Sequence, residues 1–352
     1  MYTMSTVSLA NKKKKKSRHE RADSWFGFAL TIPAIIVLCV VIALPILKGV
    51  YCSFFEYKAK DLRSDPINIT EVGAVISGEK EASALTNYTW NNFKNYTSLI
   101  KTKYLEADNF NLSKFFEKSD IITYLVNTVI FVFFTVTIQT VLGMMIALVL
   151  NSKIRGRGVF RGLLLIPWTI PSVVVAIMWR LMLHESGGVV NYVLYIFQFL
   201  PKASLSWLSA VGTARASIII ASVWRQMPYM MVMILAGLQS VDSSQIEAAN
   251  IDGASGWQAF RHVTLPAVMP VLITSVWIAI MNNFQMYTII ANLAGRGANT
   301  GTMTLSIAAY EEAFTNKNYG KGAAIGVIWL ALLFVITLLA NRASEKSANN
   351  YQ

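Results

Sequence analysis

Residues 247–266 read EAANIDGASGWQAFRHVTLP. This stretch is polar, yet apolar runs of membrane-spanning length lie on both sides of it, at 214–238 and 267–293. Gly253 favours a left-handed turn that ends a helix, and Pro266 suits the first turn of the helix that follows. A patterned connection between two such runs predicts helices that cross a membrane and a structured loop at its surface.

Two short helices are expected within this loop. Ser244 followed three residues later by Glu247 is a capping-box pattern, in which the serine caps the helix and the glutamate returns a bond to the cap residue. After the glycine turn, Trp257 and Phe260 predict a second short helix with an apolar face. A helix, a turn and a helix lying on the membrane surface would form a docking site for another protein.

The composition indicates an integral membrane protein. Of the 352 residues, 54% are hydrophobic and only 14% are charged, whereas soluble domains have about 25% charged residues. Apolar runs long enough for about 20 helical residues occur six times. They cover residues 25–51, 121–150, 160–183, 214–238, 267–293 and 322–340. The sequence therefore predicts an all-α fold with six transmembrane helices.

Basic residues set the expected orientation. The net charge is +12, and a run of lysines at 12–16 precedes the first apolar run. Because basic flanking segments stay on the cytoplasmic side, the N-terminus is expected in the cytoplasm, and an even number of spans returns the C-terminus there. Asn250 and Gln352 should then be cytoplasmic, and Asn95 should be external.

The spans divide the chain into segments. They are a basic cytoplasmic tail at 1–24, a first transmembrane helix at 25–52, an extracytoplasmic insertion at 53–120, a core of five transmembrane helices at 121–341 that contains the loop at 244–266, and a cytoplasmic tail at 342–352. A second external stretch contains a segment near 189–197 that is expected to lie as an interfacial helix. The glycine-rich residues 295–302 are expected to form a flexible surface turn.

Several kinds of chemistry are disfavoured. No acidic residue lies inside the six runs, whereas an ion-coupled transporter usually needs an intramembrane carboxylate. Gly320-Lys321 lacks the rest of a Walker A motif, so the chain is not expected to hydrolyse ATP. The GASG run around Ser255 matches a pattern of intramembrane serine proteases, but it lies in a polar loop and no later span offers a histidine base. The three histidines are far apart with no ligand spacing around them, so no metal is expected.

At this point the loop resembles a known family. Glu247-Ala248-Ala249, then Gly253, and after nine more residues the VTLP run at 263–266 are similar to the EAA loop of binding-protein-dependent ABC import permeases. The resemblance covers about 121–340 and is to the carbohydrate branch, particularly the larger maltose-type membrane subunit. It implies the type I importer permease fold. It also implies that the residues that contact an ATPase are Glu247, Ala248, Ala249, Gly253, Leu265 and Pro266.

The resemblance also implies an assembly in a bacterial or archaeal cytoplasmic membrane. Its other members would be a second homologous permease, two copies of an ABC ATPase that carry ATP and Mg, and an extracytoplasmic solute-binding protein that delivers a carbohydrate. The chain itself would be no enzyme and would bind no cofactor and no nucleic acid. Two alternatives remain. The substrate of the importer could be glycerol phosphate or another polyol-like solute, and the protein could more remotely be a secondary transporter or a channel.

Two proline-containing stretches, 166–172 and 223–231, also resemble the carbohydrate permeases. Prolines free backbone carbonyls and bend helices, and irregular backbone is tolerated where it faces a cavity. A sugar pocket needs amides for hydrogen bonds and aromatic rings for stacking. The expected substrate-binding residues are Trp168, Ser172, Arg225, Gln226, Tyr229, Asn282 and Asn283. Ordinary helix packing is the alternative for each of them, and Arg225 could instead cap carbonyls that Pro228 frees.

Overall fold

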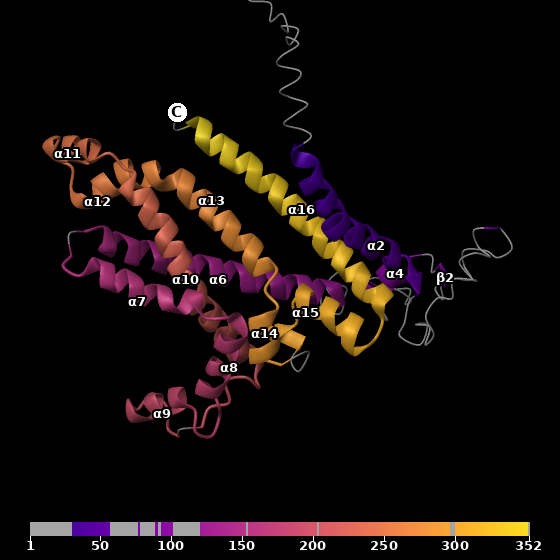
Figure 1. The fold of residues 1–352 in the computed structure, drawn as a ribbon. Coiled ribbons are helices and arrows are strands. Elements are labelled where there is room, and N and C mark those ends of the chain that lie inside the picture. Colours follow the sequence, from indigo (N-terminus) through magenta and orange to yellow (C-terminus); the bar gives the residue numbers. More distant parts are fainter. Residues whose placement is uncertain are drawn as a thin grey trace, which may run out of the picture. The chain divides into compact units, whose positions relative to one another are not determined.

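The computed structural model of the chain is built mainly of helices (Figure 1). It describes residues 30–56, 77, 89–90, 93–100, 120–152, 154–202, 204–295 and 300–350. The predicted tail at 1–24, most of the insertion at 53–120, and Gln352 lie outside these ranges. The chain forms two compact units, Met1–Tyr51 and Cys52–Gln352.

The described part of the first unit belongs to one helix, Leu30–Ser53, which is apolar and long enough to cross a membrane. Within it a π-turn, η1 (Cys39–Ala43), leads into α2 (Leu44–Ser53), and the amide of Leu44 donates to the carbonyl of Cys39. The next residue is Pro45, which has no amide to donate and whose ring crowds the preceding turn. The wider π-turn accommodates that ring.

The second unit holds the other helices and a small antiparallel sheet in which β1 (Phe55–Glu56) pairs with β2 (Thr89–Trp90). Its helices are α4 (Lys94–Ile100), α6 (Asp120–Asn151), α7 (Arg157–Thr169), α8 (Ser172–Met182), α9 (Val189–Ile196), α10 (Val211–Gln239), α11 (Ser243–Ile251), α12 (Gly256–Ala259), α13 (Leu265–Phe284), α14 (Thr288–Leu293), α15 (Leu305–Tyr310) and α16 (Tyr319–Asn350). Shorter turns are η4 (Phe260–Thr264), η5 (Thr300–Thr302) and η6 (Glu311–Thr315).

Five helices in the described ranges are long and apolar enough to cross a membrane, and α7 with α8 makes a sixth span if the two count as one. This number agrees with the six predicted runs. However, α7 and α8 meet at 93°, so the run at 160–183 is a bent pair rather than a straight helix. The bend falls at Ile170, which has a ψ of 132°, because the residue before a proline is pushed out of the helical conformation.

The predicted span at 267–293 is displaced along the chain. One helix runs from Gly256 to Phe284 through α12, η4 and α13, so the second loop helix is not separate as predicted. As in the first unit, a π-turn precedes a proline, here Pro266. The apolar residues 288–293, predicted as the end of the span, form the separate helix α14.

The centre of the second unit is the packed pair of α6 and α10, which cross in Figure 1. Gly143 on α6 permits their close approach, since a Cβ atom there would lie 3.0 Å from Cγ of Met230. Met230, Met231 and Ala147 are fully buried in this contact region. Two helices so closely packed hold their inward-facing polar side chains in fixed positions.

The two ends of the second unit carry different structures. Figure 1 shows α11 and α12 at one end and α9 at another. The expected helix near 189–197 is confirmed as α9, and the Asn191 side chain ties it to the following loop by accepting from Trp207 Nε1 at 2.7 Å and donating to the Leu205 carbonyl at 2.9 Å. Its location in a membrane interface stays a prediction.

The predicted flexible turn at 295–302 is wrong for its last three residues. In η5, the carbonyl of Gly301 accepts a hydrogen bond of 2.6 Å from Arg215 Nε, and Thr302 is buried. The same guanidinium donates to Asn127 on α6. The end of this loop is therefore fastened to α10 and α6, while residues 296–299 lie outside the described ranges.

Candidate functional site

A cavity of about 290 Å³ lies between α6, α7, α10 and α13. Sites for small solutes typically start near this volume, at roughly 300 Å³, and combine apolar walls with a few convergent polar groups. The lining residues are Gln139, Trp168, Arg225, Gln226, Tyr229, Ala279, Asn282 and Met286. Five of the seven predicted substrate-binding residues therefore surround one cavity, namely Trp168, Arg225, Gln226, Tyr229 and Asn282.

Two aromatic rings form one wall. Trp168 lies in the last turn of α7 and Tyr229 lies in α10, with ring centroids 5.9 Å apart and planes inclined by 33°. Trp168 is partly exposed because α7 ends directly after it, at the bend. Such a pair offers an apolar face beside the Tyr hydroxyl and the Trp N–H, which suits a solute with both apolar and hydroxylated surfaces.

Arg225 joins this wall to the bend between α7 and α8. Its Nε atom donates to the carbonyl of Ile170 at 3.3 Å, at the point where Pro171 interrupts the helix. The carbonyl that Arg225 caps is thus at Ile170, not beside Pro228 as the alternative for this residue supposed. Because the guanidinium also lines the cavity, its remaining N–H groups can reach a bound solute.

Asn283 lies behind the cavity wall and is not one of its lining residues. It is 1% exposed, and its Oδ1 atom accepts from Gln226 Nε2 at 2.8 Å while its Nδ2 atom donates to Gln226 Oε1 at 3.3 Å. Nδ2 also donates to the Ala279 carbonyl at 2.9 Å. The geometry makes Asn283 a brace that orients Gln226. Ser172, the first residue of α8, does not line the cavity either.

Three lining residues are outside the predicted set, namely Gln139, Met286 and Ala279, which is an alanine of α13. Gln139 comes from α6, and Met286 follows α13. Gln139 could have been noticed, because it is a carboxamide within the apolar run at 121–150 and therefore needs a partner. Met286 carries no such signal.

The loop helix α11 is capped by Asp242. Asp242 Oδ1 accepts from the Ser244 amide at 2.9 Å, and this hydrogen bond lowers the pKa of the Asp242 carboxyl below its ordinary value. The predicted capping box of Ser244 and Glu247 is therefore wrong, and the exposed Glu247 carboxylate has no capping role. A capping box does form between Ser255 and Gln258, at the start of α12.

The rest of the loop is an exposed surface. Gly253 has a φ of +82°, which confirms the left-handed turn after α11. No residue of α11 is buried, and Ile251 and Trp257 are 86% and 68% exposed. Large apolar side chains exposed among polar neighbours are typical of protein–protein contacts.

The other predicted coupling residues are divided between this surface and the helix that follows. Ala248 is exposed on α11, whereas Ala249 and Gly253 border a hollow of about 360 Å³ between α11 and α12. Leu265 and Pro266 are half-buried at the start of α13. They therefore shape the helix that the loop enters and do not form its outer face.

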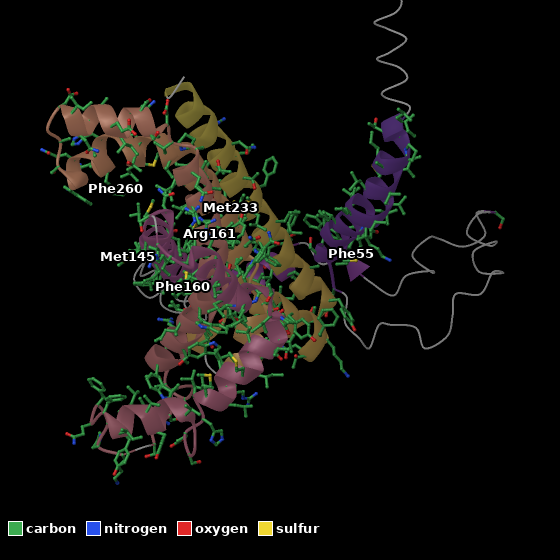
Figure 2. All side chains as sticks on the ribbon, turned by 60° about the vertical axis from the view of Figure 1, so that its left-hand side comes forward. Phe55, Met145, Phe160, Arg161, Met233 and Phe260 are labelled. Atoms are coloured by element: carbon green, nitrogen blue, oxygen red, sulfur yellow. The ribbon has the colours of Figure 1, made fainter. Side chains whose placement is uncertain are left out.

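A further hollow, of about 390 Å³, lies between α6 and α7 and has only apolar side chains in its lining. Met145 and Phe160 are two of them, and Figure 2 shows both labelled on the side of the molecule that also carries Phe260. A hollow without polar groups cannot satisfy the hydroxyls of a hydrophilic solute. This separates it from the cavity around Trp168.

Membrane-length helices around a polar cavity, with a structured and exposed loop at one end, are the features of a membrane-embedded transport subunit. Within the described part of the chain, no three His, Cys, Asp or Glu side chains are grouped to hold a metal ion. The chain belongs to the family of binding-protein-dependent transport system inner membrane components, whose model matches residues 139–348. It is a transport component with the type I ABC importer permease fold.

Relatives and solved structures agree with this assignment. The inner membrane ABC transporter permease protein YcjO of Escherichia coli is 33% identical over 94% of this chain and 97% of its own length. The trehalose/maltose transport system permease protein MalF of Thermococcus litoralis is 37% identical over 60% of this chain and 70% of its own. The crystal structure of a bacterial transporter involved in import of the acidic polysaccharide alginate has a chain of the same fold, with a TM-score of 0.70, 19% identity, and coverage of 93% and 98%.

Proposed function

We propose that this chain forms half of the translocation pathway of an ATP-driven importer for a carbohydrate. The observation that carries the proposal is the cavity lining, which combines two aromatic rings, three carboxamides and a guanidinium with no carboxylate. Rings stack on the apolar face of a sugar, and the amides and the guanidinium bond to its hydroxyls. The relative named for trehalose and maltose transport supports the same class of substrate.

An importer of this class needs further subunits beside this chain. A second homologous permease would supply the other half of the pathway, and two copies of an ABC ATPase would hold ATP and Mg. An external solute-binding protein would deliver the carbohydrate. The exposed surface formed by Glu247, Ala248 and Ile251 of α11 and by Trp257 of α12 is our candidate for the contact with the ATPase.

The helix from Gly256 to Phe284 supports a mechanical coupling between the two sites. It carries Trp257 in its first turn, in the loop, and Asn282 in its last turn, at the cavity. Between these two positions the helix is continuous, although it contains the π-turn η4 and the prolines Pro266 and Pro270. A movement that an ATPase imposes on the loop would therefore be transmitted to the cavity wall along one continuous helix.

Purification and reconstitution test the proposal. The tagged chain, extracted gently from its native membrane, should retain an ATPase, a second permease and a binding protein. In proteoliposomes this assembly should accumulate at least one member of a panel of labelled glucose, maltose, trehalose, raffinose and glycerol 3-phosphate, and only with ATP. Accumulation of glycerol 3-phosphate alone would replace carbohydrate by a phosphorylated polyol. Accumulation without ATP or without the ATPase would contradict the importer class.

We further propose that the α11 loop and both termini are cytoplasmic, and that labelling of single cysteines can test this. Asn95 is a poor external site, because its side chain is buried and donates to the carbonyls of Ser53 and Phe55 at 2.8 Å each. Thr97, two residues on, is exposed. In intact cells an impermeant thiol reagent should label Thr97→Cys and leave Asn250→Cys unlabelled; the reverse pattern would overturn the orientation.

A further inference from the structure

One side chain of the cavity is not explained by packing. Gln139 is 1% exposed, yet its Oε1 atom is enclosed without a hydrogen-bond partner among the described residues. A buried carbonyl oxygen without a partner is costly, and native proteins keep one where a ligand, a water molecule or a function satisfies it. Because Gln139 lines the cavity, a molecule that occupies the cavity is within its reach.

Two neighbouring polar groups of the lining are bonded to other residues and not to Gln139. The Gln226 amide uses both its oxygen and its nitrogen in the pair with Asn283. Arg225 Nε donates to the Ile170 carbonyl. Gln139 therefore presents the cavity with a carboxamide that the fold positions but leaves unbonded.

The position of Gln139 on α6 strengthens the argument. α6 packs extensively against α10, so the Gln139 backbone is held in place beside the cavity. A leucine or methionine would fill this place on an apolar helix at no polar cost. Retaining a glutamine here serves binding better than it serves packing.

We propose that Gln139 is a substrate-contacting and specificity-determining residue, whose side-chain amide bonds to one hydroxyl of the transported carbohydrate. This inference rests on the proposed function, and it adds α6 as a fourth helix that reads the solute, beside α7, α10 and α13. Among the carboxamides of the lining, Gln139 is then a direct ligand, while the Gln226–Asn283 pair is mainly a support for the wall.

The chain provides a matched control next to this residue. Thr140 is the following residue of α6, and its Oγ1 atom is likewise buried without a partner among the described residues, but it does not line the cavity. Gln139→Met and Thr140→Val each remove a buried, unbonded oxygen while keeping a similar volume. Only the first should affect the substrate.

The experiment uses the complete transporter in proteoliposomes, with the binding protein at saturating concentration and the saccharide of the panel that the wild type accumulates. Gln139→Met should lower the uptake rate by about twofold to tenfold, the effect of one neutral hydrogen bond, with the melting temperature unchanged or raised. Thr140→Val should match the wild type in both. Gln139→Glu, which keeps an acceptor of the same size, should recover part of the uptake.

Monodeoxy analogues of that saccharide provide the readout that a structural role would not change. The wild type should discriminate against the analogue that lacks the contacted hydroxyl, and Gln139→Met should lose that discrimination selectively. Unchanged uptake in Gln139→Met, or uptake that falls equally for every analogue, would overturn the inference, because bound water alone would then satisfy Gln139. If the wild type accumulates no saccharide, the proposed function itself fails, which is a distinct result.

Discussion

The cavity and the α11 loop are opposite kinds of functional surface. Around the cavity the polar side chains are buried and several bond to one another, as in the Gln226–Asn283 pair. In the loop the side chains are exposed, and two large apolar ones, Ile251 and Trp257, remain largely uncovered although the Trp257 ring lies 5.5 Å from that of Phe260. The residues that line the cavity are thus held by contacts within this chain, whereas the loop surface would become buried when a partner binds.

Because of this difference, we expect the two surfaces to respond differently to mutation. In the cavity, a substitution acts first on the packing and hydrogen bonds of the chain itself, so effects on stability and on transport are mixed. In the loop, a substitution should leave the chain folded and act on assembly alone. Mutations in the two regions can therefore test whether effects on assembly are separate from effects on stability.

The largest effect is expected at Trp257. Trp257→Ala should weaken binding of the ATPase by about 30-fold or more, because exposed tryptophans at the centre of a contact commonly contribute 2 kcal/mol or more. Glu247→Lys should act in the same direction. Titration of the purified chain with the ATPase measures both, and the melting temperature of the chain should not change.

A control for Glu247→Lys lies on the same helix, α11. Gln245 is exposed on α11 two residues before Glu247, which places it on a different face. Gln245→Ala should bind the ATPase as the wild type does. Wild-type affinity in Trp257→Ala and Glu247→Lys together would remove the loop from the coupling interface.

Substitution of two glycines compares the helical core with the loop. Gly143→Ala should lower the free energy of unfolding by about 1–3 kcal/mol, because the new methyl group meets Met230 in the core. Gly253→Ala should cost about 1–2 kcal/mol locally, because its φ is +82° although no atom crowds it. Thermal unfolding should register the first substitution, and hydrogen exchange confined to α11 and α12 should register the second. A global loss of stability in Gly253→Ala would contradict the independence of the loop.

The amide pair should show the mixed behaviour of the cavity. Asn283→Leu removes the partner of Gln226 and should destabilise the chain by about 1 kcal/mol, a typical value for hydrogen bonds between membrane helices. The double variant Gln226→Leu with Asn283→Leu should be more stable than the sum of the two single variants predicts. Strict additivity in thermal unfolding would show that the pair does not act as a brace.

The smallest effect is expected from the Asp242 cap. Because the folded-state pKa of Asp242 lies below its ordinary value of 3.8, the cap contributes to helix α11 above that value and loses its contribution as the pH falls through the lowered pKa. Asp242→Asn keeps a capping side chain but removes the titration. Protease cleavage within α11, compared between pH 5 and pH 3, should increase in the wild type more than in this variant.

The sequence predicted the membrane helices well because their signal is local. Apolar runs of sufficient length must become helices in a bilayer, and glycine after α11 must turn. The ends of the helices were harder to predict from the sequence. Residues 288–293 are as apolar as the span before them, so their composition does not show that α13 ends at Phe284. The proline at 171 indicated a disturbance, but its 93° magnitude depends on the packing of α7 against α10.

The sequence predicted most of the residues that line the cavity, but it did not predict which of them face the cavity and which bond to a neighbouring helix. Four lining residues followed from polar or aromatic groups in proline-containing stretches, and the fifth, Asn282, followed from an amide pair in an otherwise apolar run. Whether Asn283 faces the cavity or the Gln226 amide depends on the rotation of α13 against α10, which a single sequence does not show. Gln139 did carry a signal, since it is a carboxamide within an apolar run. The cap was misassigned because Asp242 and Ser244 are equally good capping residues only two positions apart.

We expect the cavity around Trp168 to be a translocation site whose access alternates under the control of the loop. Asn282→Cys, made in a chain whose Cys39 and Cys52 are replaced by serine, places a reporter in the cavity wall. In proteoliposomes of the complete transporter, an impermeant thiol reagent should reach this cysteine from one side without nucleotide and from the other side with ATP trapped, and the transported saccharide should slow labelling. Labelling from the same side in both states, unaffected by the saccharide, would contradict the account.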